Sequence, residues 1–208
     1  MRSGASIRAN SSPRVAWCLK TKNPSVVRME HFRLPKERVG VAIGPDGEIK
    51  REIERRTGTK LTFDGETGEV IIEPGDDPLG LLCAKNVLNA IARGFSSERA
   101  FLLFNEDKYL EVIDMEDFVG RSDKALVRFK GRVIGEGGKT RRIIEETTGV
   151  CMSVYGKTVA LIGVPEQLTV AREAIQMLLG GAPHSAVYGF LERKRREAKR
   201  RAGEIWRK

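Results

Sequence analysis

Two stretches of 23 residues in this chain resemble each other closely, and this duplication constrains the fold more than any other feature. Residues 43–65 (IGPDGEIKREIERRTGTKLTFDG) align without a gap with residues 134–156 (IGEGGKTRRIIEETTGVCMSVYG), at an offset of 91. Nine of the 23 positions are identical, so we infer a duplicated structural unit. The identical pairs are Ile43/Ile134, Gly44/Gly135, Gly47/Gly138, Arg51/Arg142, Ile53/Ile144, Glu54/Glu145, Thr57/Thr148, Gly58/Gly149 and Gly65/Gly156.

The second copy contains Gly-Lys-Thr at residues 138–140, which is the end of a nucleotide-binding P-loop. That pattern requires a glycine five residues before Gly138, where this chain has Val133. The first copy has Glu and Ile at residues 48–49 in place of Lys and Thr. The element common to both copies is GxxG followed by a helix, which disfavours a nucleotide-hydrolysing enzyme.

Each copy predicts the same order of elements: strand, helix, GxxG, helix, strand, strand, helix. Apolar residues recur at helical spacing after each GxxG, and Gly58 and Gly149 suit the C-caps of these helices. The period then falls to two in the hairpins. We predict strands at 29–35 and 108–115, first helices at 35–43 and 123–134, second helices at 48–58 and 139–149, hairpins at 60–74 and 150–163, and last helices at 77–95 and 165–181.

The net charge of +9 is unevenly distributed along the chain. Residues 1–29 hold six Lys and Arg and no acid, and residues 190–208 hold nine basic residues and three Glu. Residues 30–189 hold 22 basic and 25 acidic residues. Basic ends on a slightly acidic body favour a polyanionic partner such as nucleic acid, although a solvated helix and a flexible arm fit the charge equally well.

Several other function classes are disfavoured. No apolar run is long enough to span a membrane, and the N-terminus lacks a signal-peptide core, so we expect a cytoplasmic protein with no membrane partner. Cys18, Cys83 and Cys151 form no CxxC pair, and His31 and His184 stand apart. We therefore expect no metal site, no cofactor and no catalytic residues.

The order of elements around the two GxxG motifs resembles the type I KH (K-homology) RNA-binding domain. The resemblance implies an α+β fold (an α/β sandwich) of two tandem type I KH domains, each β-α-α-β-β-α with a three-stranded sheet covered by helices, plus a basic C-terminal helix. The predicted domains are a basic, flexible arm at 1–27, a first KH domain at 28–96, a connector at 97–107, a second KH domain at 108–183, and a basic helical tail at 184–208.

The sequences FKGRVIGEGGKTRRIIEETTG and MLLGGAPHSAVYGFLERKR also resemble the KH-domain assembly factors of the small ribosomal subunit, the "partner of Nob-one" group of archaea and eukaryotes. This resemblance implies a non-enzymatic protein that binds single-stranded pre-rRNA or rRNA near the 3′ end of the small-subunit RNA. A pre-rRNA endonuclease or another ribosome-assembly protein is the implied protein partner, and we expect a monomer. The resemblance rests on Gly180, Pro183, Val187, Tyr188 and Gly189.

The GxxG loop of a KH unit clamps about four nucleotides of the RNA backbone. Its glycines let the RNA approach closely, and the following helix N-terminus attracts phosphate. An acid lies inside each loop, Asp46 or Glu136, but the second loop has more basic neighbours, so we predict that the second domain is the main RNA reader. The candidate RNA-binding residues are Gly44, Pro45, Asp46, Gly47, Lys50 and Arg51 in the first copy, and Lys130, Arg132, Ile134, Gly135, Glu136, Gly137, Gly138, Lys139, Arg141 and Arg142 in the second.

Other assignments stay open. The aliphatic residues Val41, Ile43, Ile49, Ile53, Val133, Ile134, Ile143 and Ile144 line either the nucleotide groove or the core. The tail fits phosphate contact, a solvated extension or a protein-docking helix, and Trp206 fits either an anchor or an exposed end. A protein scaffold with degenerate KH units and an exosome-type KH protein are the alternative functions. Because residues 101–104 (FLLF) lie in the short connector, we expect the two domains to pack into one body.

Overall fold

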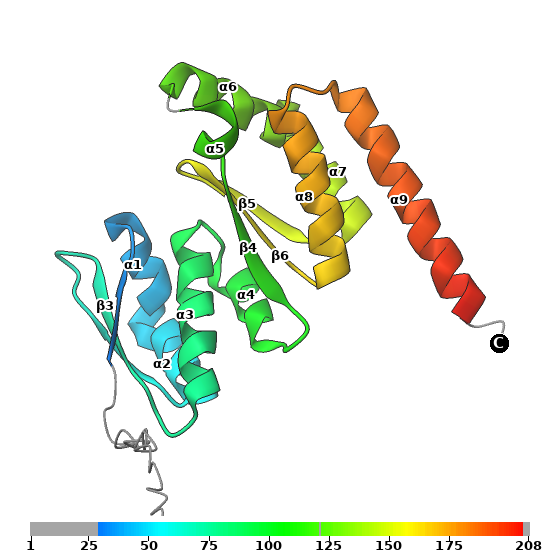
Figure 1. Cartoon of the computed structure of the whole chain (residues 1–208). Helices are drawn as coiled ribbons and strands as arrows, with labels where there is room; N and C mark the ends of the chain where they lie inside the picture. Colours follow the sequence, from blue (N-terminus) through cyan, green and yellow to red (C-terminus); the bar gives the residue numbers. More distant parts are fainter. Residues whose placement is uncertain (1–28, 121, 206–208) are drawn as a thin grey trace, which may run out of the picture.

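The chain folds into two successive units of the same design, each a three-stranded antiparallel sheet with helices packed on it (Figure 1). The structure is a computed structural model that describes residues 29–120 and 122–205. The predicted arm at 1–27, Cys18 and Trp206 lie outside the described residues.

The first unit runs from β1 to α3, and the second runs from β4 to α8. The first comprises β1 (Glu30–Arg33), α1 (Lys36–Ile43), the 3-10 turn η1 (Pro45–Gly47), α2 (Glu48–Thr57), β2 (Lys60–Phe63), β3 (Glu69–Glu73) and α3 (Pro78–Ala92). The second comprises β4 (Tyr109–Asp114), α5 (Glu116–Val119), α6 (Asp123–Ile134), η3 (Glu136–Gly138), α7 (Lys139–Thr148), β5 (Cys151–Tyr155), β6 (Thr158–Gly163) and α8 (Pro165–Leu179). The predicted α+β fold of two KH-type units is confirmed; the short helix α5 was not predicted.

The strand that follows each GxxG helix lies at the edge of its sheet. The strand orders are β1-β3-β2 and β4-β6-β5, and all neighbours are antiparallel. In the first sheet Val70 and Ile72 of the central strand face the helices and are fully buried. At the edge strands β2 and β5, the Leu61 and Met152 amides donate to Glu54 of α2 and Glu145 of α7.

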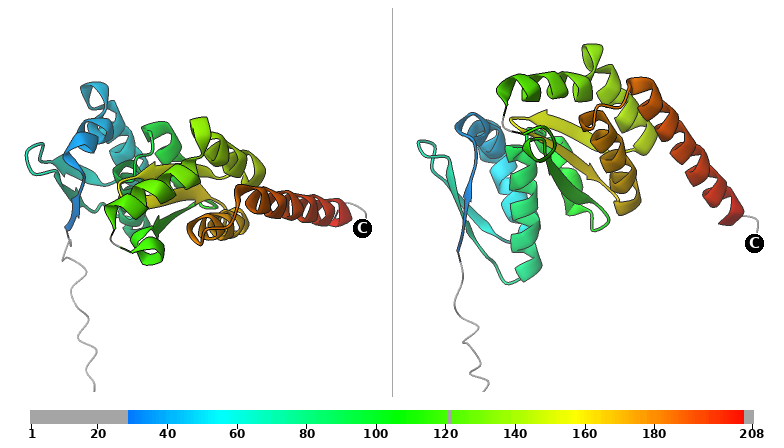
Figure 2. Two further views of the ribbon diagram at one scale, coloured as in Figure 1. Left: turned by 90° about the horizontal axis from the view of Figure 1, so that it is seen from above. Right: turned by 45° about the horizontal axis from the view of Figure 1, so that its top comes forward.

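The central strand of the second sheet, β6, is buried on both faces. Val159 and Leu161 point into the core beneath α6, α7 and α8. Ala160 and Ile162 alternate with them and join the core of the first unit. Because side chains of one strand point alternately to opposite faces, the first unit must cover the back of the second sheet. Figure 2 shows the two units side by side from two directions.

Polar contacts flank this shared core. The Ser153 hydroxyl donates to the backbone oxygen of Arg93 at 2.9 Å, and the Tyr155 hydroxyl donates to Glu37. That bond to a carboxylate is the main cause that raises the pKa of Tyr155 above its usual value. The two units thus pack into one body, as the apolar connector predicted.

The connector between the units is helical rather than extended. It comprises α4 (Ser97–Ala100) and the 3-10 turn η2 (Phe101–Phe104). Leu103 is buried in the core of the first unit, and the guanidinium of Arg56 on α2 lies 4.8 Å from the centre of the Phe104 ring. These contacts fix the connector on the first unit.

The basic C-terminal segment forms α9 (His184–Ile205), which packs against α7 and α8 and then extends past them (Figure 1). Val187 and Leu191 are fully buried in the core of the second unit. The Tyr188 hydroxyl lies 2.9 Å from the Thr140 hydroxyl, at the start of α7. The predicted boundary at residue 183 therefore divides segments whose side chains share one core.

Replacing Ile162 with alanine tests the shared core. The side chain is 1% exposed and serves both units, so its truncation leaves a cavity between them. We expect the free energy of unfolding to fall by about 2–4 kcal/mol, with both units unfolding in one transition. Denaturant unfolding followed by NMR signals from each unit measures this. Two separate transitions, with the first unit unaffected, would show that the units fold independently.

Candidate nucleic-acid interface

The first glycine of each GxxG loop is required by close packing. Gly44 and Gly135 have φ of 74°, with ψ near 180°, a conformation that glycine alone adopts readily. A Cβ at Gly44 would lie 2.4 Å from the Ile49 side chain, and one at Gly135 would lie 2.3 Å from the Thr140 hydroxyl. Each glycine therefore lets the next helix start directly beneath the loop.

The third loop residue differs between the copies in chemistry but not in backbone conformation. Asp46 has φ 49° and ψ 19°, and Gly137 has φ 56° and ψ 22°. Asp46 is the one described residue other than glycine with positive φ. The first loop thus holds an acid in a left-handed conformation that costs about 1–2 kcal/mol, although Asp tolerates it better than most residues. The second loop has neither the strain nor that acid.

Each loop ends at a helix whose first amides have no side-chain cap. Gly47 and Gly138 are the N-caps of α2 and α7, and neither helix has a side-chain hydrogen bond that caps its N-terminus. The amides of Glu48 and Lys139 donate to the backbone oxygens of Pro45 and Glu136 within the 3-10 turns. The positive end of the helix dipole, together with first-turn amides that lack a side-chain cap, favours an anion at this position. The first turn of α2 carries Glu48, whereas the first residue of α7 is Lys139. Local charge therefore favours phosphate at the second loop.

An arginine in the first turns of the following helix, present in both copies, donates a hydrogen bond to a backbone oxygen of each loop. Arg51 donates through Nη2 to the Asp46 backbone oxygen at 2.8 Å, and Arg142 donates through Nη2 to the Gly137 backbone oxygen at 3.1 Å. Both side chains are exposed. These two predicted site residues thus lie at the loops and hold their backbone conformation.

A glutamate that is present in both copies joins the helix after each loop to the edge strand of its sheet. Glu54 accepts from the Leu61 amide at 2.8 Å, and Glu145 accepts from the Met152 amide at 2.9 Å. One turn earlier in each helix lies a cation, Lys50 at 3.9 Å from Glu54 in the first unit and Arg141 at 3.6 Å from Glu145 in the second. The space between helix and edge strand is therefore lined by charged groups in both units.

Three of the eight aliphatic residues that could line either the nucleotide groove or the core belong to the buried core. Ile53, Val133 and Ile144 are fully buried and cannot touch a nucleotide. Ile134, just before the second loop, is 36% exposed and remains accessible. The others, Val41, Ile43, Ile49 and Ile143, are half-buried.

The remaining predicted residues divide between the loop and the packing behind it. Pro45, Glu136 and Lys139 are exposed on the loops, and Lys130 is half-buried on α6. Arg132 donates to the backbone oxygen of Ala182, in the link between α8 and α9. Arg132 therefore holds that link.

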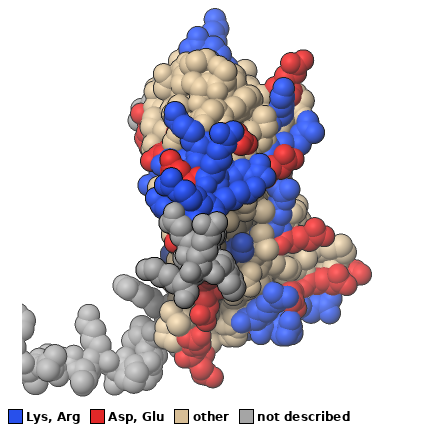
Figure 3. Space-filling view, turned by 90° about the vertical axis from the view of Figure 1, so that its right-hand side faces the viewer, with Lys and Arg blue, Asp and Glu red and all other residues tan. Residues whose placement is uncertain are grey.

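Positive charge also gathers on α9. Figure 3, which views the right-hand side of Figure 1, shows a group of Lys and Arg side chains in the middle of this face, with acidic side chains beside it. The Lys and Arg residues of α9 are Arg193, Lys194, Arg195, Arg196, Lys199, Arg200 and Arg201. Among the residues that the structure describes, α9 included, no helix is long and apolar enough to cross a membrane. Within the same residues no group of three or more His, Cys, Asp or Glu could hold a metal ion.

Sequence reasoning missed one charged residue at the second loop's helix. Arg99, from the connector, donates to Glu145 at 2.9 Å. No motif or period marks Arg99, because the contact joins residues 46 positions apart.

Two alanine substitutions separate the packing requirement from the backbone requirement. Both Gly135 and Gly137 have positive φ, but a Cβ at Gly137 would meet nothing within 4 Å. We expect Gly137→Ala to lower the free energy of unfolding by about 1–2 kcal/mol. Gly135→Ala should cost at least about 1 kcal/mol more, because Thr140 must also move. Urea unfolding of both variants measures the difference; equal losses would mean that the close approach to Thr140 is unimportant.

Comparison with known proteins matches each of the two units to a KH-domain family. Residues 29–89 match the KH domain family, and residues 109–196 match the eukaryotic type KH-domain (KH-domain type I) family. A KH domain-containing protein of Methanocaldococcus jannaschii is 47% identical over 86% of this chain and 80% of its own length.

A protein of known structure and a eukaryotic protein also resemble this chain. A chain in the crystal structure of the a/eIF2alpha-aDim2p-rRNA complex from Pyrococcus horikoshii OT3 is 49% identical, with a TM-score of 0.76 over 82% of this chain and 95% of that chain. The pre-rRNA-processing protein pno1 of Schizosaccharomyces pombe is 28% identical over 60% of this chain, which spans about half (52%) of the yeast protein. The chain therefore belongs to the tandem KH-domain proteins of the PNO1/Dim2 group.

Proposed function

We propose that this protein binds single-stranded rRNA or pre-rRNA of the small ribosomal subunit, near its 3′ end, as a non-enzymatic assembly factor. The observation that carries the proposal is the second GxxG loop, which ends at a helix start without a side-chain cap and with Lys139 in its first turn. The relatives add support, since one is named a pre-rRNA-processing protein and another occurs with rRNA in a crystal structure.

We further propose that the second loop is the main clamp. A phosphate at the first loop would meet Asp46 and Glu48, whereas one at the second would meet Glu136 and Lys139. The candidate contacts at the second loop are Gly135 to Lys139, with Arg142 beneath them. The first loop is then a weaker, second attachment, and two linked weak sites can bind well together.

The chemistry of the loops fits a protein that binds RNA without catalysing a reaction. Backbone amides, glycines and cations bind a phosphate, but the loops contain no activated nucleophile or acid–base pair. A protein partner is also proposed, because the related complex contains a/eIF2alpha beside the RNA. We propose that this chain binds the RNA and the protein partner as a monomer.

The substitution Gly137→Asp tests the clamp. Asp46 already occupies the same backbone conformation in the first loop, so the variant should fold while placing an acid where phosphate would bind. We expect weaker binding of a labelled single strand from the 3′ end of small-subunit rRNA. The slope of log K against log salt should also be shallower, since each phosphate neutralised on a single strand contributes about −0.7.

Asn86→Asp is the matched control, because it adds the same charge on an exposed position of α3 outside both loops. Binding by this control should equal that of the wild type, and a scrambled RNA should bind less well. If Gly137→Asp also binds like the wild type, the second loop is not the clamp. If Asp46→Gly strengthens binding more than Gly137→Asp weakens it, the first loop carries the larger share.

A further inference from the structure

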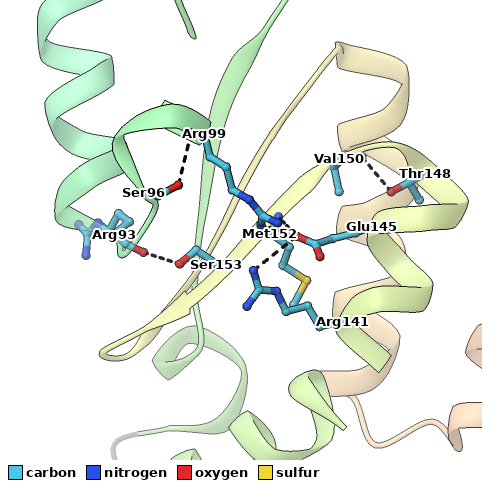
Figure 4. A network of polar contacts seen from close by, with 9 residues as sticks. All are labelled: Arg93, Ser96, Arg99, Arg141, Glu145, Thr148, Val150, Met152 and Ser153. Atoms are coloured by element: carbon cyan, nitrogen blue, oxygen red, sulfur yellow. Dashed lines mark hydrogen bonds and ion pairs between the residues drawn. The ribbon is translucent and has the colours of Figure 1, made fainter. Parts of the chain in front are cut away.

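An arginine of the connector reaches across to the helix that follows the second loop. Arg99 extends from α4 over the edge of β5, and its Nη1 donates to the Glu145 carboxylate at 2.9 Å (Figure 4). Arg141 approaches the same carboxylate oxygen at 3.6 Å, which is too long for a hydrogen bond. Two guanidinium groups from different segments therefore flank one carboxylate.

The carboxylate lies between the helix that follows the second loop and the edge of the sheet, within reach of a strand held at that loop. Glu145 accepts the outward-facing amide of Met152 on the edge strand β5. It lies six residues after Lys139, about 9 Å along α7 from the loop. A strand whose backbone is clamped over about four nucleotides reaches that far.

The first unit lacks this additional cation. Glu54 holds the Leu61 amide in the same way and has Lys50 nearby, but no cation from another segment contacts it among the described residues. The Arg99 contact is thus an addition to the duplicated design and is specific to the second unit.

The three groups leave a positive charge that is open to solvent. The Arg99 and Arg141 side chains are 42% and 38% exposed, and the Glu145 side chain is 18% exposed. Two cations on one anion leave a net charge of +1. Only one nitrogen of Arg99 contacts Glu145, so other donors of its five remain for a ligand.

A purely structural role explains this arrangement poorly. Neither guanidinium is enclosed as in a buried structural ion pair, because the Arg99 and Arg141 side chains keep 42% and 38% of their surface exposed. The two units are already joined by the buried side chains of Ala160 and Ile162. The connector is itself fixed on the first unit through Leu103 and the Arg56–Phe104 contact, so Arg99 is held in place before any ligand binds.

We propose that the RNA site of the second KH domain is composite: Arg99 of the connector and Arg141 of α7 bind a phosphate of the same strand that the Gly135–Gly138 loop clamps. Glu145 orients the guanidinium of Arg99 and leaves its other edge for the phosphate, the planar geometry for which arginine is suited. The connector is then part of the RNA site as well as a link between the domains. This inference rests on the proposed function.

Anisotropy titrations of the labelled 3′-end RNA, run at several salt concentrations, test the proposal on the full chain. We expect Arg99→Ala to weaken binding about three- to tenfold and to make the log K–log salt slope shallower by about 0.7, as for one lost phosphate contact. Arg99→Lys keeps the charge and should restore the slope and part of the affinity. Tyr155→Phe is the matched control, because it removes another bond between the units without changing charge.

The outcomes separate the two proposals. If the wild type binds RNA, Gly137→Asp weakens it and Arg99→Ala does not, the composite site is wrong and the proposed function stands. If Tyr155→Phe weakens binding as much as Arg99→Ala, Arg99 acts only through the orientation of the units, and the composite site is again wrong. A changed base preference with an unchanged salt slope overturns the phosphate assignment. A wild-type protein without RNA affinity overturns both.

Discussion

Strand β6 has no solvent-facing side, and the arrangement of the two KH units depends on this. Residues 159 and 161 enter one core while residues 160 and 162 enter the other, so neither unit can bury its apolar surface alone. A sheet with one face open would have allowed the units to move independently about the connector. Burial on both faces instead fixes the back of the second sheet against α3 and the connector. This packing places α4 beside the second unit, so that Arg99 of α4 reaches Glu145 of α7.

The sequence predicted those features of the fold that depend on local periodicity. The GxxG loops, the helices after them, the C-caps Gly58 and Gly149 and the hairpins were all visible from spacing, because each depends on residues close in the chain. The contacts missing from the prediction join distant segments. Arg99 with Glu145 and Tyr188 with Thr140 carry no signal in either partner's neighbourhood. Likewise, Ile53 and Ile144 lie on helical faces that spacing alone cannot assign to core or groove.

One difference between the two copies, Thr140 in place of Ile49, is explained by the elements packed around it. Position 140 is a threonine that is 1% exposed, and a buried hydroxyl requires a partner. Tyr188 of α9 supplies that partner. The equivalent residue in the first unit is Ile49, and that unit is followed by the connector where the second is followed by α9. The polar residue is thus found where a neighbouring helix can satisfy it, which links the identity of a residue at the start of α7 to a helix more than 40 residues later.

Distance decides how much the basic helix can contribute to the loop. A helix of 22 residues is about 33 Å long, whereas charges in physiological salt are screened over about 8 Å. Tyr188 contacts the residue after Lys139 near the start of α9, and the basic residues begin at Arg193 and continue to Arg201. They lie about 8–20 Å farther along the axis, beyond one screening length for most of them. A phosphate in the second loop therefore interacts mainly with Lys139 and its neighbours. The charge of α9 acts on RNA only if the strand continues along that helix.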